Sequence, residues 1–185
     1  MESFRKVAQE LLDEITGMLS MVDPSTYTVI VNDLLSAKNV VVAGEGRSRY
    51  VMGTFARRLS LLGRAVTVHG EAVGRPASRG DLLIVGSLHG RRGTLSTLAE
   101  SARKRGALVV AFVGETSCIL ASHADHVVAI ASQTRTPFES IGGGGRASSL
   151  VFDEAMMLYL DAILIALQQI LGIDPVLLDE KDNDI

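Results

Sequence analysis

The sequence predicts a three-layer α/β/α sandwich around a five-stranded parallel sheet of order 2-1-3-4-5, with two helices before it and a long helix after it. Short runs of β-branched and other apolar residues alternate with helical stretches. These runs are apolar on both faces, as parallel strands covered by helices are. The length of 185 residues and the 47% hydrophobic content suit one domain with a sizeable core. We therefore expect a single domain over 1–185, with a helical arm (1–38), an α/β core (39–147) and a C-terminal helix and tail (148–185).

Two helices are predicted before the first strand. Apolar residues at spacings of three and four form one stripe over residues 3–20. Asp23 and Pro24 then combine a helix cap with a first-turn proline, and a second helix follows through Leu35. We expect both helices to pack on the sheet or on a partner chain.

From residue 39 the pattern changes to strands separated by helices. The predicted strands are Asn39–Ala43, Ala65–His69, Asp81–Val85, Ala107–Val113 and His126–Ile130. Helices are predicted over 49–62, 94–105 and 117–122. The connection Gly70–Gly80 has no helical period, so it must cross the sheet as a loop. The last helix, 148–171, is apolar around most of its circumference, and we expect it to be buried on more than one side and to join a subunit interface.

Composition narrows the possible functions. With 18 Lys and Arg against 21 Asp and Glu, the net charge is −3, which lacks the basic surface of a nucleic-acid binder. The longest apolar stretch, Ala155–Leu167, contains Asp161 and is shorter than the about 20 residues that a bilayer span needs. The N-terminus does not read as a signal peptide, and a single cysteine, Cys118, fits a reducing compartment. We expect a cytoplasmic protein that binds neither nucleic acid nor membrane.

No metal or other cofactor is expected. His123 and His126 follow Cys118 at a spacing that matches no standard zinc pattern. The thiol of Cys118 is expected to be buried and inert.

The first loop that can carry chemistry is Gly44–Ser48, which follows a strand and opens a helix. Gly44 and Gly46 allow backbone N–H groups to approach an anion, and Arg47 and Ser48 add a charge and a hydroxyl. An ordinary strand-to-helix turn with a solvated arginine explains the pattern equally well. A dinucleotide site is excluded, because the third small residue of that motif is replaced by Arg49 and no Walker lysine is present.

The second loop runs from Gly86 to Thr94, after the third strand and before another helix. In the predicted strand order the first and third strands are neighbours at the reversal point, so both loops flank one crevice. A phosphate cradle is favoured over two unrelated surface loops. The predicted binding residues of this loop are Ser87, His89, Gly90, Arg91, Arg92 and Thr94.

The residues around these loops resemble the SIS (sugar isomerase) domain, and within it the 6-phospho-3-hexuloisomerases. The run Val41–Ser48, followed by Phe55–Leu59, is similar to that family's Gly-x-Gly-Arg-Ser signature and the helix after it. Gly70-Glu71 and the final helix, with Phe152-Asp153, also fit in register. The resemblance implies binding of a phosphosugar, interconversion of ketoses by proton transfer, and an oligomer, typically a tetramer, whose sites draw on neighbouring chains.

Several positions depart from the family pattern. The phosphate loop Ser-Gly-Ser-Gly-Glu-Thr has His89 in place of its second serine, and Arg91 and Arg92 in place of Glu-Thr. The two arginines either receive a ligand with more negative charge than a monophosphate, or they point to solvent or pair with Asp or Glu of a neighbouring chain. The family's likely catalytic glutamate aligns with Asp153, which is one methylene shorter.

The resemblance makes Asp153 the candidate base, with Glu154 and His89 as substitutes. A helix N-terminus favours the ionised carboxylate, whereas apolar neighbours such as Phe152 and Met156 oppose ionisation. Glu71 either joins the crevice or is solvated.

The leading function is a phosphosugar isomerase that acts on ketose phosphates through an enediolate, as a dimer or tetramer. The alternative is a non-catalytic phosphosugar-binding or regulatory domain. Gly142–Gly145 could form a lid that brings in Arg135 and Arg146, or a flexible linker.

Overall fold

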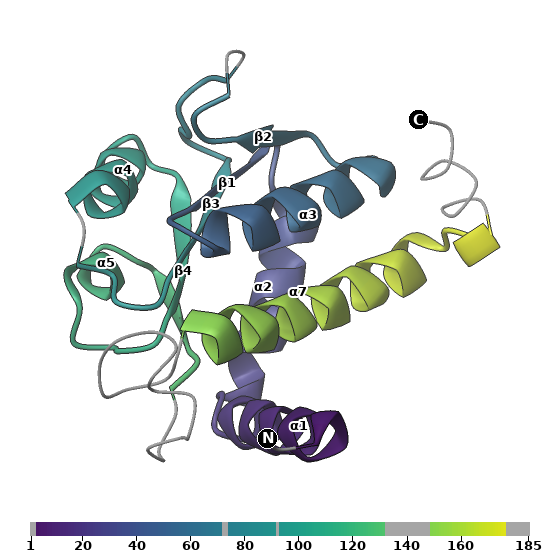
Figure 1. Ribbon diagram of the computed structural model, residues 1–185. Helices are drawn as coiled ribbons and strands as arrows, with labels where there is room; N and C mark the ends of the chain where they lie inside the picture. Colours follow the sequence, from purple (N-terminus) through teal and green to yellow (C-terminus); the bar gives the residue numbers. More distant parts are fainter. Residues whose placement is uncertain (1–2, 72–73, 92, 132–148, 177–185) are drawn as a thin grey trace.

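The computed structural model describes residues 3–71, 74–91, 93–131 and 149–176. Figure 1 shows a sheet with helices on both sides, and α7 runs along one of these two sides. In chain order the elements are α1 (Phe4–Ser20), α2 (Pro24–Ser36), β1 (Val40–Gly44), α3 (Ser48–Leu61), β2 (Val66–Val68), β3 (Leu82–Ser87), α4 (Gly93–Lys104), β4 (Leu108–Val113), α5 (Ile119–Ser122), β5 (His126–Ala129) and α7 (Ser149–Leu171).

The described strands form one parallel sheet in the order β2-β1-β3-β4-β5. At the reversal point, β1 pairs with β2 on one side and with β3 on the other, so that Val42 faces Val68 and Ile84. The edge strands are short, with three residues in β2 and four in β5. The predicted fold class and strand order are confirmed.

Two apolar cores lie on opposite faces of the sheet, because successive residues of a strand point to opposite sides. Val40 and Val42 belong to the core beneath α3 and α7, whereas Val41 and Ala43 belong to the core beneath α4 and α5. Figure 1 shows α4 and α5 together on one side and α3 beside α7 on the other. These faces are the outer layers of the sandwich.

The two N-terminal helices begin where the sequence predicts. Asp23 accepts a hydrogen bond from the Ser25 N–H at 2.8 Å, and Pro24 occupies the first turn of α2. Both helices contact α7, and Tyr27 of α2 donates a hydrogen bond from its hydroxyl to the Ala162 carbonyl at 3.0 Å. The arm therefore packs within its own chain.

The apolar character of α7 is mostly explained inside the chain. Packing by α1, α2 and α3 buries residues such as Phe152, Ile163 and Leu167 completely. Leu158 and Ile165 stay about half exposed. The predicted subunit interface thus depends on a narrower strip than the sequence indicates, and it stays a prediction.

The third strand extends beyond its predicted end. Gly86 and Ser87 pair with Phe112 and Val113 of β4, so they belong to β3 and not to the following loop. Thr94 lies inside α4, which begins at Gly93. The loop between β3 and α4 is thus shorter than predicted, and Ser87 is held by the sheet.

The connection from β2 to β3 has no helix in its described part, residues 69–71 and 74–81, as the sequence predicts. In a doubly wound sheet a helix normally covers such a crossing. Here a space beside α4 is left open over β1 and β2. Among the described helices, none is both long enough and apolar enough to cross a membrane.

Candidate functional site

The two predicted loops meet at one pocket above the carboxyl ends of β1 and β3. We call this cavity of about 370 Å³ the carboxyl-edge pocket. Its lining residues are Glu45, Gly46, Arg47, Ser48, Ser87, Leu88, His89, Arg91 and Asp153. The loops are therefore neighbours, as their places in the strand order predict, and α7 adds Asp153 to them.

The first loop needs glycine for steric reasons. A Cβ on Gly44 would stand 2.7 Å from the backbone of Ser48 and from the Arg49 nitrogen, which is closer than real contacts allow. Gly46 has a φ of +57°, a conformation that side chains disfavour. The tight turn directs Ser48, the first residue of α3, toward the pocket.

The second loop is held from behind by the segment before α5. Gly90 has a φ of +54°, and a Cβ there would collide with the Cys118 Sγ. The Ser87 Oγ accepts a hydrogen bond from the Gly90 N–H at 3.1 Å, and the Gly90 carbonyl accepts one from the Leu120 N–H at 3.2 Å. Cys118 is buried, as predicted, and packs against this loop.

Asp153 is the buried carboxylate of the pocket, with 2% of its surface exposed. Its Oδ1 accepts a hydrogen bond of 2.6 Å from the Ser48 hydroxyl. Burial raises the pKa of the Asp153 carboxyl above its ordinary value, although the Ser48 hydrogen bond and the Arg47 charge oppose this effect. The raised pKa means that desolvation outweighs the Ser48 hydrogen bond and the Arg47 charge, and the nearby Glu154 charge acts in the same direction as desolvation.

Arg47 connects the pocket to both acids at the start of α7. Its Nε lies 3.7 Å from Asp153 Oδ2, and its Nη2 lies 3.6 Å from Glu154 Oε1. The Arg47 side chain is half exposed, so it can turn toward a ligand, and the buried Asp153 carboxylate would then keep the Ser48 hydroxyl as its hydrogen-bond partner. Glu154 is exposed and does not line the pocket.

Two of the departures from the family pattern, His89 and Arg91, lie at the rim of the pocket. His89 and Arg91 are both exposed, and Arg91 Nη2 lies 3.4 Å from Glu115 Oε2. Arg91 thus pairs with an acidic group of its own chain, which neither of the two alternatives for the arginines predicts. Arg92 lies outside the described residues.

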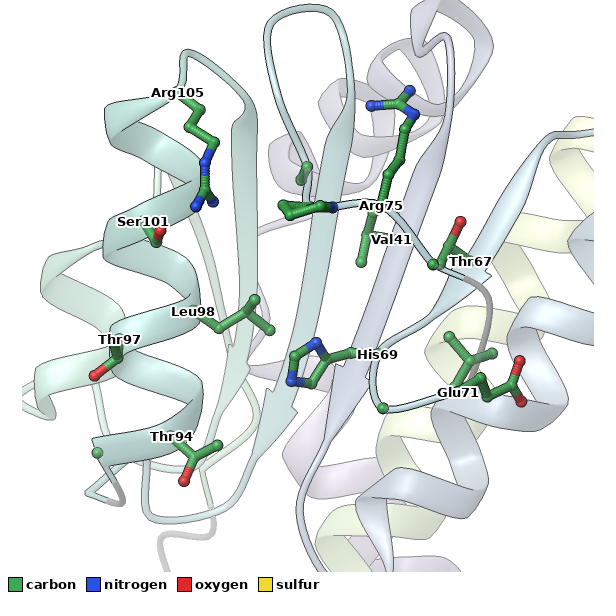
Figure 2. Close-up of a pocket in the computed structure, with 16 residues that line it drawn as sticks. Val41, Thr67, His69, Glu71, Arg75, Thr94, Thr97, Leu98, Ser101 and Arg105 are labelled. Atoms are coloured by element: carbon green, nitrogen blue, oxygen red, sulfur yellow. The ribbon is translucent and has the colours of Figure 1, made fainter.

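Gly44 and Gly90 belong to the two loops but do not line the pocket, and two further predicted binding residues lie elsewhere. Thr94 and Glu71 line a second, larger cavity beside α4, which is shown in Figure 2. Their predicted role in holding a sugar phosphate stays a prediction. The glycines 142–145 and the two arginines Arg135 and Arg146 lie outside the described residues.

No group of three His, Cys, Asp or Glu side chains suited to a metal occurs within the ranges that the structure describes. No local pattern indicates that Ser48 bonds Asp153, since the two residues are 105 positions apart. Glu45 and Leu88 lie within the two predicted loops and line the pocket, although neither is among the predicted binding residues. The helix-free crossing after β2 was the available clue to the second cavity.

Comparison with known proteins identifies the family. Residues 33–164 match the SIS domain. The chain belongs to the SIS domain family. This SIS domain is 34% identical over 151 residues to the 3-hexulose-6-phosphate isomerase of Mycobacterium gastri, a match that covers 82% of this chain and 75% of the relative.

Solved structures share the fold of this SIS domain. One is a protein of Methanococcus jannaschii from whose structure a function of 3-hexulose-6-phosphate isomerase has been inferred. It has a TM-score of 0.78 at 22% identity and covers 91% of this chain and 95% of its own. Another is Vibrio vulnificus NanR complexed with ManNAc-6P, with a TM-score of 0.78 at 21% identity, covering 98% of this chain and 68% of its own.

Proposed function

We propose that this SIS domain is a sugar-phosphate isomerase of the 3-hexulose-6-phosphate isomerase type, with the carboxyl-edge pocket as its active site. The observation that carries the proposal is Asp153, a buried carboxylate with a raised pKa at the edge of a pocket lined by Arg47 and His89. The similarity to the isomerase of Mycobacterium gastri supports the choice of substrate class.

The phosphate of the substrate binds the two loops. Arg47 and His89 supply donors there, together with backbone N–H groups of the turns at Gly46 and Gly90. Arg47 then exchanges its long contacts with Asp153 and Glu154 for the phosphate. The sugar chain extends toward Asp153.

Asp153 acts as the base. Its ionised carboxylate removes the proton from the carbon next to the ketone, and the electron pair of that C–H bond forms the enediolate. The hydroxyl proton of the first carbon passes to the former carbonyl oxygen, and the protonated Asp153 returns its own proton to the former carbonyl carbon. The carbonyl thus moves by one position and no other reactant is consumed. A raised pKa makes the carboxylate a stronger base near neutral pH.

The function is tested by an NMR time course with hexulose 6-phosphates, run beside a thermal-shift screen of phosphosugars. Turnover with stabilisation supports the isomerase. Stabilisation without turnover contradicts it, and absence of both contradicts any phosphosugar function.

A non-catalytic phosphosugar-binding or regulatory domain is the second candidate. The observation that favours it is the rim of the pocket, where His89 and Arg91 replace residues of the family's phosphate loop and Arg91 pairs with Glu115. The shared fold with NanR, which is complexed with ManNAc-6P, is compatible with it. The same paired experiment separates the two candidates.

We also propose that the protein assembles as a dimer or tetramer through the exposed strip of α7 that contains Leu158 and Ile165. Exposed apolar side chains on an otherwise buried helix are typical of subunit contacts. Light scattering at micromolar concentration should give at least twice the mass of 19.7 kDa, and replacing both residues with Glu should reduce that mass. A monomeric wild-type protein contradicts the proposal.

A further inference from the structure

A cavity larger than the carboxyl-edge pocket lies beside α4. We call it the α4 groove. Its volume is about 720 Å³, against about 370 Å³ for the carboxyl-edge pocket, and the two share no lining residue. The groove is lined by Val41, Thr67, Val68, His69, Gly70, Glu71, Gly74, Arg75, Pro76, Ala77, Gly93, Thr94, Thr97, Leu98, Ser101 and Arg105.

The groove exists because the crossing from β2 to β3 has no helix to cover this face. Val41 and Thr67 are paired residues of β1 and β2, and both line the cavity. α4 forms one wall and the chain after β2 forms the other (Figure 2). The floor is therefore the sheet itself, and it is set by the fold.

One face of α4 contributes a row of polar groups. Thr94, Thr97, Ser101 and Arg105 follow one another at spacings of three and four, so they lie on one side of the helix and its end. The row extends along about 16 Å, at about 1.5 Å for each of eleven steps. This length suits a ligand longer than a hexose phosphate.

The charged side chain that faces the groove without a carboxylate partner among the described residues is that of Arg105. Figure 2 shows the Arg105 guanidinium and the His69 ring directed into it, whereas the Glu71 carboxylate is directed away from them. Arg75 is engaged by Asp81 in two hydrogen bonds of 2.6 and 2.8 Å. No carboxylate partner of Arg105 is found among the residues that the structure describes.

The end of α4 does not cancel this charge. The N–H groups of Arg105, Gly106 and Ala107 already bond carbonyls of the last turn of the helix, at 2.9 to 3.2 Å. Those carbonyls are thereby satisfied and do not repel an anion as open ones would. The Arg105 guanidinium therefore dominates this end of the groove.

The body of the groove is apolar. Val41 and Ala77 are buried in the floor, and Leu98 and Pro76 add carbon surface from the two walls. His69 lies across from Leu98 in Figure 2. An imidazole ring opposite an aliphatic side chain suits a planar ring, because bases stack on histidine as they do on other aromatic side chains.

We propose that the α4 groove binds a nucleoside phosphate, with its phosphate groups at Arg105 and Ser101 and its base beside His69 and Leu98. A sugar phosphate would leave the apolar floor unused, and an apolar ligand would leave Arg105 unpaired. The inference is independent of the proposed isomerase activity, because no residue of the carboxyl-edge pocket takes part.

Isothermal titration calorimetry of the full chain with AMP, ADP and ATP tests the proposal. At least one of them should bind, with adenosine and inorganic phosphate each at least tenfold weaker. Arg105→Ala should raise the Kd of that nucleotide more than tenfold, and His69→Ala should also raise it. Lys104→Ala is the matched control, since this neighbouring cation pairs with Glu100 at 2.6 Å, and it should leave the Kd unchanged.

Competition separates the two cavities. Saturating fructose 6-phosphate should not displace the nucleotide, and Arg47→Ala should not change its Kd. Displacement, or sensitivity to Arg47→Ala, would assign the nucleotide to the carboxyl-edge pocket and overturn the proposal. Absence of binding at millimolar nucleotide, or equal affinity in Arg105→Ala, would overturn it as well, whatever the isomerase assay gives.

Discussion

Two aspartates of this protein are equally buried and electrostatically opposite. Asp81 precedes β3 at the amino edge of the sheet, and Asp153 lies in α7 beside the carboxyl edge, each with 2% of its surface exposed. Asp81 accepts two hydrogen bonds from Arg75 and two from Ser78, through its N–H at 2.9 Å and its hydroxyl at 3.1 Å. Asp153 accepts one from Ser48, while the Arg47 nitrogen stands at 3.7 Å.

The pKa shifts of the two carboxyls have opposite signs, because hydrogen bonds dominate at Asp81 and desolvation dominates at Asp153. The Arg75 hydrogen bonds lower the pKa of Asp81, despite its burial. Burial raises the pKa of Asp153, because a single hydroxyl and a distant cation do not replace the lost water. A carboxylate whose oxygens accept several hydrogen bonds holds the local structure in place. A buried carboxylate with fewer hydrogen bonds has a higher affinity for a proton and is suited to proton transfer.

The largest expected effect is on turnover. Asp153→Asn should lower kcat about 100-fold or more, because an amide cannot accept the proton and general bases typically contribute 10²–10⁴-fold. Phosphosugar affinity should stay nearly intact in titration calorimetry. Asp161→Asn, eight residues further along α7, is the control for changes in this helix. Full activity of Asp153→Asn would show that Asp153, like Asp81, has a structural role. The role of the base would then fall to Glu154 or His89.

The second effect is on stability at the other aspartate. Asp81→Asn should cost about 2 kcal/mol at pH 7, because hydrogen bonds to a charged group are lost. For a chain of this size the melting temperature should fall by about 4–8 °C. Calorimetry of the exposed control Asp13→Asn should show almost no change.

The pH dependence of this loss follows from the lowered pKa of Asp81. The stabilisation is present above the ordinary value of 3.8 and is lost as the pH falls through the lowered pKa. The difference between wild type and Asp81→Asn should therefore shrink in strong acid. A difference that grows in acid would contradict the comparison.

A smaller effect of opposite sign is expected at Asp153. Because the pKa of Asp153 is raised on folding, the protonated carboxyl stabilises the folded state and the ionised carboxylate destabilises it. This stabilisation is complete below pH 3.8 and is lost as the pH rises through the raised pKa. Asp153→Asn keeps an oxygen for the Ser48 hydroxyl and removes the charge. It should melt about 2–4 °C above wild type at pH 7, as about 1 kcal/mol would give, and the gain should disappear toward pH 3.8. A melting temperature of Asp153→Asn below that of the wild type at pH 7 would show that the surrounding groups stabilise the ionised Asp153 carboxylate well.

The finest test concerns Ser48 as a positioning residue. Ser48→Ala removes the hydrogen bond that favours the ionised Asp153, so the pKa of Asp153 should rise further. The acidic limb of the kcat profile should move to higher pH, while kcat on the plateau changes less than about tenfold. Ser48→Thr should restore the limb. A change in KM alone, with the acidic limb of the kcat profile unchanged, would instead indicate that Ser48 binds the phosphate of the substrate.

The sequence predicts the fold well because its signals are local. The two-faced apolar runs of Val40–Val42 and Leu82–Val85 indicate parallel strands, and the unpatterned Gly70–Gly80 indicates a crossing without a helix. The strand order then places both loops at one crevice. Each of these inferences needs only the neighbouring residues and a rule of topology.

Contacts between side chains that are far apart in the chain could not be predicted from the sequence. Nothing at Ser48 indicates a bond to Asp153, and nothing at Arg91 indicates Glu115. The raised pKa of Asp153 depends on how completely α3 and α7 exclude water, which is a property of packing and not of the motif. Thr94 lines a different cavity because it lies in the first turn of α4, on the side of the helix that faces the α4 groove.

The shortness of the edge strands bears on aggregation. β2 offers three residues and β5 four, so another chain that paired with either edge would gain only a few backbone hydrogen bonds. Half-buried side chains along β2 leave that edge without a long flat apolar surface. In concentrated solution the folded protein is therefore protected against aggregation by pairing of sheet edges. Fibril formation would first require that the long central strands, β3 and β4, separate from their neighbouring strands.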